Sequence, residues 1–289
     1  MKIGLIDVDS YNFPNLALMK ISAFHKQQSD TVDWWHGFEE YDVVYKSKVF
    51  TFTKDENTVI RADKVIKGGT GYNLCTTLPQ EIENMFPDYS LYTHHEEAYG
   101  FLTRGCPRNC AFCIVGEKEG LRTYKVADLK DFWNGQKIIK LLDPNILAYR
   151  DKENLLQQLL DSKAWVDFTQ GLDVRLLTKE DAGFINKMKV KMIHFAWDNY
   201  EFKTYEKLKQ AREWIRYDER KLRVYVLTNF GTTHEQDLER IYKLRELKYD
   251  PYVMIYKKEK APKITRQMAR WVNNKYIWRS CDKFEDYGR

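Results

Sequence analysis

Short apolar segments alternate with helix-patterned segments along most of the chain, and this alternation predicts an α/β fold. Before residue 90, an apolar run at Lys2–Asp9 is short enough to be a buried strand, and a helical pattern follows at Leu16–Phe24. Further strand-length segments lie at Thr31–Trp35, Tyr41–Tyr45 and Lys64–Ile66. We therefore expect a small Rossmann-like α/β domain with parallel strands over residues 1–95.

The alternation becomes regular from Tyr99 onward, where six strand and helix repeats follow one another. The expected strands are Tyr99–Thr103, Lys137–Leu142, Trp165–Leu177, Met192–Trp197, Leu222–Thr228 and Tyr252–Tyr256. The expected helices are Val126–Trp133, Glu153–Leu160, Lys179–Lys189, Phe202–Arg216, Glu235–Leu247 and Thr265–Val272. Parallel strands joined by helical crossovers are the expected consequence. Residues 96–262 are thus assigned to a second α/β domain, and residues 263–289 to a helix and tail that pack on it.

Composition narrows the class of protein only in part. A chain of 289 residues with 43% hydrophobic content can bury a substantial core. Its 47 basic and 42 acidic residues are interspersed, so a net charge of +5 does not by itself establish a nucleic-acid partner. No apolar run approaches the roughly 18 to 20 residues of a membrane span, and no signal peptide is apparent. We expect a cytoplasmic protein without a membrane partner.

Three of the five cysteines, Cys106, Cys110 and Cys113, lie close together in a C-x-x-x-C-x-x-C pattern. The spacing does not match the paired C-x-x-C sets typical of structural zinc, and an odd number of cysteines argues against a disulfide framework. Such a loop can supply three thiolates to an iron–sulfur cluster, and no fourth cysteine follows nearby. One iron would therefore stay open to a substrate or cofactor.

This spacing, with Phe112 before the last cysteine and Gly105 and Pro107 around the first, resembles the radical S-adenosylmethionine (radical SAM) superfamily. The resemblance implies a partial (βα)6 barrel, a four-iron four-sulfur (4Fe-4S) cluster on the three cysteines, and SAM bound at the open iron. It also implies reductive cleavage of SAM to a 5'-deoxyadenosyl radical that abstracts hydrogen from a substrate. A reductant such as flavodoxin or ferredoxin would supply the electron.

An α/β domain ahead of such a barrel is similar to the cobalamin-binding domain of one branch of that superfamily. The D-x-H-x-x-G motif typical of that branch is absent, and His25 and His36 have the wrong context. Either the domain keeps the fold without the cofactor, or it binds cobalamin without a lower histidine ligand; we favour the first. Asp7 and Asp9 are expected to cap the helix that follows the first strand.

Chemistry in a parallel α/β barrel lies at the carboxyl ends of the strands, so polar residues there are candidates for SAM binding. Asp143 is predicted to hold the SAM ammonium group, or alternatively to cap a turn. Gln170 and Asp173 are expected in a buried strand, where they could contact the SAM ribose, and Arg175 could pair with a carboxylate. The complete set of cofactor-binding candidates is Asp143, Asn145, Gln170, Asp173, Arg175 and Asn229.

The C-terminal tail leaves two interpretations open. Trp271 and Trp278 are predicted to anchor it against the side of the barrel, whereas Cys281 or Tyr287 could donate hydrogen to a substrate radical. The substrate itself is not specified by any motif, and the candidates are a modified nucleotide or nucleic acid, a small metabolite and a peptide. A non-catalytic iron–sulfur or zinc protein, associated with nucleic acid, is the alternative function.

Overall fold

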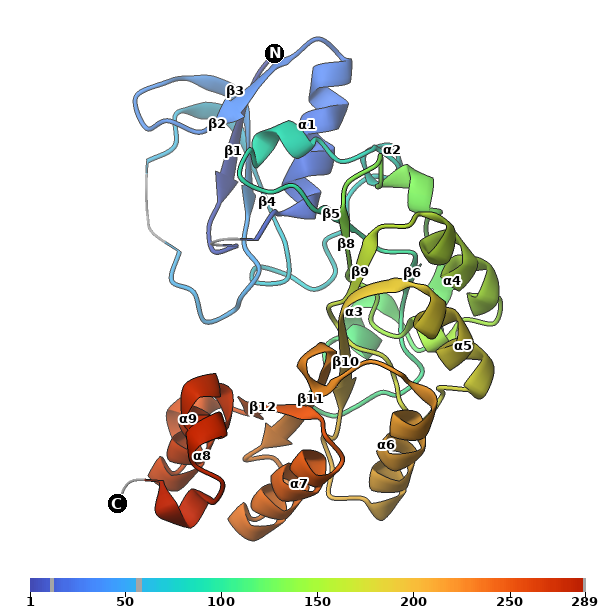
Figure 1. The fold of residues 1–289 in the computed structure, drawn as a ribbon. Coiled ribbons are helices and arrows are strands. Elements are labelled where there is room, and N and C mark those ends of the chain that lie inside the picture. Colours follow the sequence, from blue (N-terminus) through green and yellow to red (C-terminus); the bar gives the residue numbers. More distant parts are fainter. Residues whose placement is uncertain (11–12, 56–58, 288–289) are drawn as a thin grey trace.

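Two parallel sheets and one short antiparallel ribbon organise the chain in a computed structural model that describes residues 1–10, 13–55 and 59–287. Figure 1 shows the N-terminal sheet as a separate unit beside the larger sheet, with the last two helices at the opposite end. The class is therefore α/β, as the sequence predicts.

The N-terminal sheet has the strand order β2-β1-β3-β4, and all neighbouring strands are parallel. Its elements are β1 Lys2–Asp7, α1 Leu16–Gln27, β2 Thr31–Trp34, β3 Tyr41–Ser47, β4 Ala62–Gly68 and the short α2 Gln80–Glu83. Ile3 and Leu5 of β1 are buried against Leu18 and Ile21 of α1. This packing places the sheet against one helical layer.

The predicted capping of α1 by Asp7 and Asp9 is wrong, because Asn15 caps this helix by accepting a hydrogen bond from the Leu18 amide at 3.3 Å. Asp9 is buried and accepts hydrogen bonds from the amides of Val49 at 2.7 Å and Phe50 at 2.9 Å. Its carboxylate therefore holds the loop after β3 instead of starting a helix.

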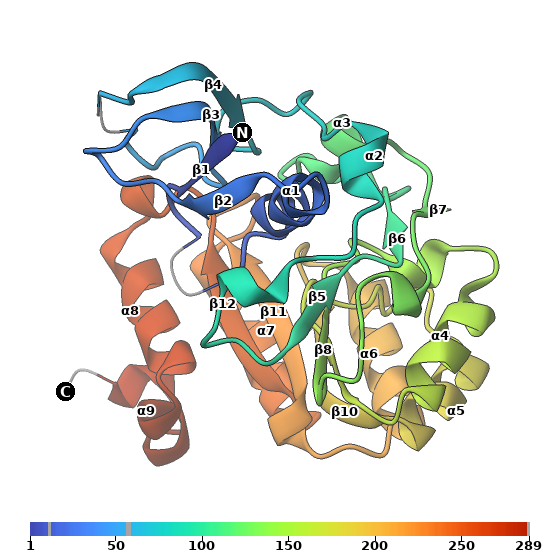
Figure 2. The same ribbon diagram turned by 90° about the horizontal axis from the view of Figure 1, so that it is seen from above.

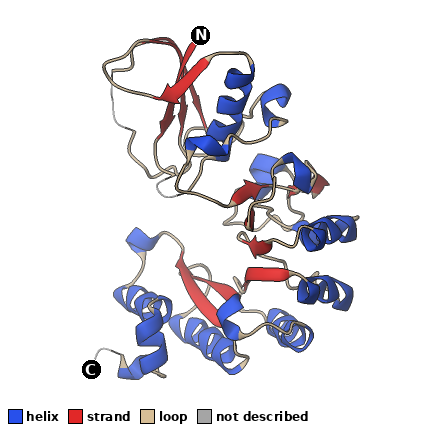
Figure 3. Ribbon diagram, turned by 45° about the horizontal axis from the view of Figure 1, so that its top comes forward, coloured by secondary structure: helices blue, strands red, loops and turns tan. Residues whose placement is uncertain are grey.

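The larger sheet has six strands in the order β12-β11-β10-β9-β8-β5, and every neighbouring pair is parallel. The strands are β5 Ala98–Gly100, β8 Ile138–Leu141, β9 Trp165–Phe168, β10 Lys189–Ala196, β11 Leu222–Thr228 and β12 Asp250–Ile255. The helices α4 Lys152–Asp161, α5 Lys179–Lys187, α6 Phe202–Trp214 and α7 His234–Glu246 all cover the same side of it (Figure 3). One apolar core fills most of the space between that side and the helices, and Ile241 of α7 packs with Val253 of β12 in a second cluster.

Two predicted elements of this unit are wrong in extent. Val126–Trp133 is not a helix, and only the 3-10 turn Leu129–Asp131 forms there. The amides of Val126 and Ala127 donate to the Leu102 carbonyl at 2.9 and 3.4 Å, which commits them to contacts outside a helix.

The strand expected at Trp165–Leu177 ends at Phe168. Gly171 then adopts φ +99°, and the Leu172 amide turns to the His194 carbonyl at 2.7 Å. Gln170, Asp173 and Arg175 therefore lie in a loop at the carboxyl end of β9 and not within the strand.

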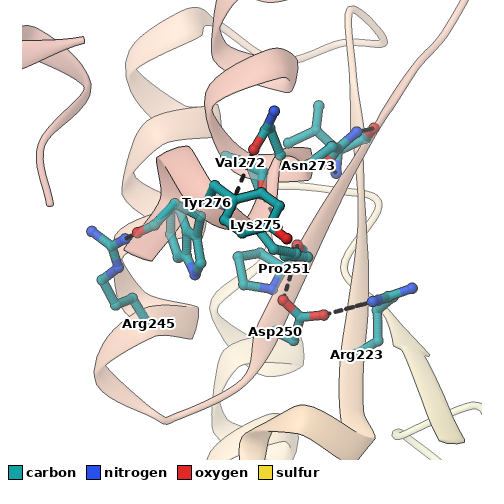
Figure 4. Close-up of polar contacts among 11 residues, drawn as sticks. Arg223, Arg245, Asp250, Pro251, Val272, Asn273, Lys275 and Tyr276 are labelled. Carbon is teal, nitrogen blue, oxygen red and sulfur yellow. Dashed lines mark hydrogen bonds and ion pairs between the residues drawn. The ribbon is translucent and has the colours of Figure 1, made fainter. Parts of the chain in front are cut away.

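The C-terminal helices α8 Lys263–Asn273 and α9 Lys275–Ser280 cover the edge strand β12. The Asn273 side chain donates to the Val253 carbonyl at 2.9 Å and accepts from the Val253 amide at 2.8 Å, so it satisfies backbone groups that an edge strand leaves unpaired. Figure 4 shows Asp250 between Lys275 of α9 and Arg223 of β11, with which it forms ion pairs. The helices thus close one side of the sheet.

Candidate functional site

The cysteine-rich segment is a loop closed at its base by the ribbon of β6 Thr103–Arg104 and β7 Tyr124–Lys125. Gly105 begins the loop at φ +78°, and a Cβ atom there would lie 2.0 Å from the Arg122 carbonyl oxygen. Only glycine can occupy this position without displacing the backbone. Glu119, at the end of α3 Val115–Glu119, accepts from the Gly105 amide at 3.0 Å and closes the loop from the other end.

All five cysteines are free thiols, and each lies within the described residues. Cys106 and Cys110 are half-buried, and Cys113 is exposed. Burial, then the charge of Asp198 and the neighbouring thiols, raise the pKa of Cys110, whereas the Arg175 guanidinium opposes this rise. The three thiols therefore share one region with a carboxylate and a guanidinium group.

Asp143 follows β8 and points into the protein, where its carboxylate is almost completely buried. It accepts hydrogen bonds from the Leu102 amide at 3.1 Å, the Thr103 amide at 2.6 Å and the Thr103 hydroxyl at 2.7 Å. Burial raises the pKa of Asp143 to about 6, although these three donors oppose the rise. Its contacts hold the segment that enters the cysteine loop, and direct contact with a ligand stays a prediction.

Asn145 connects the cysteine loop to the loop after β9. Its amide nitrogen lies 3.5 Å from the Cys106 sulfur and 3.4 Å from Asp173 Oδ2. Asp173 also accepts from Arg108 Nε at 2.5 Å and from Arg175 Nε at 2.7 Å. Burial opposes ionisation of Asp173, but Arg175 and Arg108 hold the pKa of this carboxyl below its usual value.

The structure thus brings together four candidates that are far apart in the sequence: Cys106, Asn145, Asp173 and Arg175. The Asn145 Oδ1 oxygen is buried and has no hydrogen-bond partner among residues 1–10, 13–55 and 59–287. A buried acceptor of this kind is normally satisfied, so its position marks the place where a donor from a bound molecule would fit.

Phe112 of the cysteine loop contacts an aromatic side chain at the carboxyl edge of the sheet. Its ring meets Phe230 of the loop after β11 edge-on, with ring centroids 5.4 Å apart, and Phe230 meets Tyr256 at 4.9 Å. Strands β5 and β11 are four spacings apart in the sheet order, which is about 19 Å in a flat sheet. The loops after β5 and β11 therefore converge over one region.

Asn229 lies at the same edge but does not direct its side chain to the thiols. It has φ +61°, and its amide nitrogen donates to the Tyr256 carbonyl at 2.8 Å. Gln170 is exposed in the loop after β9. Cys281 and Tyr287 pack in the C-terminal cluster around Trp271, far from α3 in both Figure 1 and Figure 2.

Arg240 of α7 is a supporting residue that the sequence reading missed. Its guanidinium is fully buried, forms an ion pair with Asp237, and donates to the carbonyls of Asp198 at 3.1 Å and Leu227 at 2.7 Å. It therefore joins the carboxyl ends of β10 and β11. One feature of the sequence could have indicated this role. Asp237 and Arg240 are charged and three positions apart, yet they lie on the same stripe of α7 as the buried Leu244.

Asp198 is the carboxylate that this arrangement holds beside the thiols. Burial raises the pKa of Asp198 to about 6, while Arg240 and Arg175 oppose the rise.

In the N-terminal unit, both ring nitrogens of His25 already have partners, which are Asp30 at 2.7 Å and Tyr45 at 3.0 Å. Over the described ranges, no three His, Cys, Asp or Glu side chains converge closely enough to hold a single metal ion.

Comparisons with known proteins give a partial structural similarity. No protein-family model and no curated protein sequence matches the chain. Crystal structures of Streptococcus suis SuiB are similar to it: the complex with precursor peptide SuiA at 15% identity and a TM-score of 0.45, and the complex with S-adenosylmethionine at 15% and 0.46. Each alignment covers 64% of this chain and 46% or 48% of SuiB, so the chain spans about half of these structures.

Within the part of the chain that the structure describes, no helix combines the length and the apolar character required to cross a bilayer.

Proposed function

We propose that this chain is a radical SAM enzyme built on a partial (βα)6 barrel. The observation that carries the proposal is the network in which Asn145 links the Cys106 sulfur to Asp173, which in turn pairs with Arg175. It joins one thiol of the C-x-x-x-C-x-x-C loop to polar groups of a neighbouring strand end. That is where a parallel α/β barrel binds its ligands.

The donor set fits a 4Fe-4S cluster. Cys106, Cys110 and Cys113 are free thiols on one loop, and thiolates are the usual protein ligands of such clusters. Each thiolate of a cluster binds a different iron, so three sulfurs need not converge on one point. The Asn145 amide N–H near Cys106 is a contact of the type that tunes the potential of a cluster.

The polar residues have separate roles in this proposal. Asn145 Oδ1, buried without a partner in the described chain, would accept a hydrogen bond from the SAM ammonium group. Arg175 would pair with the SAM carboxylate, since its guanidinium is near Cys110 and only partly buried. Asp143 would orient the loop, and Asn229 would present backbone groups to the adenine.

Bound at these thiolates, a reduced cluster would supply one electron that splits SAM into methionine and a 5'-deoxyadenosyl radical. The chain's own contribution is to orient and enclose the reactants. Phe112, Phe230 and Tyr256 form an aromatic wall at this edge of the sheet, which would exclude water from the radical. Hydrogen abstraction from a substrate is the proposed outcome.

The test is anaerobic reconstitution with iron and sulfide, followed by SAM and dithionite or reduced flavodoxin. We expect close to four irons per chain and formation of 5'-deoxyadenosine, measured by chromatography. Cys110→Ala should lose both, whereas Cys75→Ala, a change at an exposed thiol outside the motif, should keep both. Full iron content without any 5'-deoxyadenosine would favour a binding protein, and zinc at these thiols would refute the cluster assignment.

A further inference from the structure

The face of the larger sheet opposite the helices carries a row of polar and aromatic side chains. Neighbouring positions such as Ile139 and Val166 belong to the helix-covered core, so residues one position away along each strand point to the other face. This face, called the inner face below, includes one such residue from each strand: Tyr99, Lys140, Asp167, His194, Tyr225 and Tyr252.

Contacts join neighbouring members of the row in two groups. Lys140 Nζ donates to the Tyr99 hydroxyl at 3.1 Å, and His194 Nδ1 lies 3.8 Å from Asp167 Oδ1. The rings of His194 and Tyr225 stack with their centroids 5.0 Å apart and 8° between their planes. The inner face is therefore an ordered surface.

The cations of this face already have partners. Lys140 pairs with Glu97 at 3.3 Å, and Arg223 pairs with Asp250 at 2.8 Å. The Oδ1 atom of Asp167, in contrast, is fully buried and has no hydrogen-bond partner among the residues that the structure describes. A buried carboxylate oxygen without a donor costs free energy, so it is a ready acceptor for a ligand.

His194 offers a second acceptor beside it. Its Nδ1 atom lies 3.0 Å from the Phe168 carbonyl, which requires a proton on that nitrogen and leaves Nε2 as the acceptor of the neutral ring. Burial, opposed by the Phe168 contact and assisted by Arg223, lowers the pKa of His194 to about 4. The ring therefore stays neutral at physiological pH.

We propose that the inner face binds the substrate of this enzyme through a planar group with N–H donors, which Asp167 and His194 accept beside the aromatic surface of Tyr225 and Tyr252. A primary amide or the amino edge of a nitrogen heterocycle has this chemistry. The inference rests on the proposed function. A simple ammonium ion fits less well, because Lys140 and Arg223 lie near Asp167 and would repel it.

Nicotinamide is a suitable probe, and 3-acetylpyridine is its matched control, because the methyl ketone keeps the ring and the carbonyl but lacks the N–H donors. Binding to the reconstituted protein with saturating SAM would be followed by ligand-observed NMR titration. We expect nicotinamide to bind roughly tenfold or more tightly than 3-acetylpyridine, the ratio for one hydrogen bond to a charged acceptor.

Asp167→Leu should remove this preference, and Asp161→Leu, at an exposed aspartate of α4, should retain it. Asp167→Asn provides a second variant with nearly unchanged shape, and it should weaken nicotinamide binding by a smaller factor. Melting temperature and iron content report whether each variant folds and holds its cluster.

Equal binding of the two probes, binding of neither, or an unchanged preference in both Asp167 variants would overturn the inference. Failure of the proposed function has a different signature, because it would appear in the unmodified protein as missing iron or missing 5'-deoxyadenosine. The two failures can therefore be distinguished.

Discussion

Replacing Arg240 with methionine tests how the carboxyl ends of β10 and β11 are held together. The side chain is fully buried, pairs with the buried Asp237, and donates to the carbonyls of Trp197, Asp198 and Leu227. Methionine has a similar length and is apolar, so the main loss is charge and hydrogen bonds. Asp237 would then be a buried carboxylate without its cation.

Breaking a buried ion pair by removing one partner typically costs about 3–5 kcal/mol of the free energy of unfolding. We expect a loss in this range, which is a large part of the roughly 5–15 kcal/mol of stability of a typical domain. The carbonyl of Asp198 also loses a hydrogen-bond donor, which adds to the loss of stability. The carboxylate of the same residue lies near Cys110. Iron content after reconstitution should therefore fall together with stability.

The assay is urea unfolding followed by circular dichroism. Arg216→Met is the matched control, because Arg216 is exposed and a surface change of this kind usually shifts stability by less than about 0.5 kcal/mol. The double variant Asp237→Leu with Arg240→Met should be less destabilised than the sum of the two single variants, with a coupling of about 1–3 kcal/mol. A single Arg240→Met variant as stable as the control, or a coupling near zero, would refute this account of the pair.

Further predictions concern the cysteine loop, pH and the sheet edge. Gly105→Ala should cost at least about 2 kcal/mol and lower iron content, because its Cβ would meet backbone at 2.0 Å; Gly183→Ala, in helix α5 with nothing within 4 Å, should be neutral or stabilising by up to about 1 kcal/mol. The buried Asp143, with a pKa of about 6 against 3.8 in the unfolded chain, binds its proton more tightly when folded. The contribution of Asp143 to stability should therefore fall by up to about 3 kcal/mol as pH rises from about 4 to 6 and then level off, so the difference in free energy of unfolding between the unmodified protein and Asp143→Asn should change by up to that amount over this range in unfolding titrations. Asn273→Ala should cost about 1–3 kcal/mol and speed proteolysis of α8 and α9, because both Val253 backbone groups lose their partner. Unchanged digestion kinetics would contradict that role.

Local signals in the sequence predicted much of the element order. The Thr-x-x-Gln spacing of Thr233 and Gln236 is typical of a capping box, and it starts α7, with the Gln236 amide donating to the Thr233 hydroxyl at 3.3 Å. All six expected strands of the larger sheet have a counterpart: β11 has the expected bounds, four others have shifted ends, and β5 retains only the first residues of the expected strand. The C-x-x-x-C-x-x-C spacing is also local, so the thiols could be recognised without any fold.

Strand ends and side-chain directions needed the tertiary structure, because contacts between distant segments decide them. The strand β9 ends early because the Leu172 amide bonds to His194, and Asp143 turns inward because Thr103 offers it donors from 40 residues away. Neither contact leaves a mark in the local pattern of apolar residues. The sequence identifies Asp143 as a polar residue at a strand end, but it does not show that its side chain points into the protein.

Residue patterns along the chain were sufficient to predict the α/β class, the order of most strands and helices, and the three thiols that are the candidate cluster ligands. These properties depend on residue spacing over a few turns or strand lengths, which is visible in one dimension. Three relations needed the folded structure: Asn145 lies between Cys106 and Asp173, Arg240 joins two strand ends, and the Asp167 Oδ1 atom on the inner face has no hydrogen-bond partner in the described chain. Those relations arise only when parallel strands bring side chains from different parts of the chain to one edge and one face of a sheet.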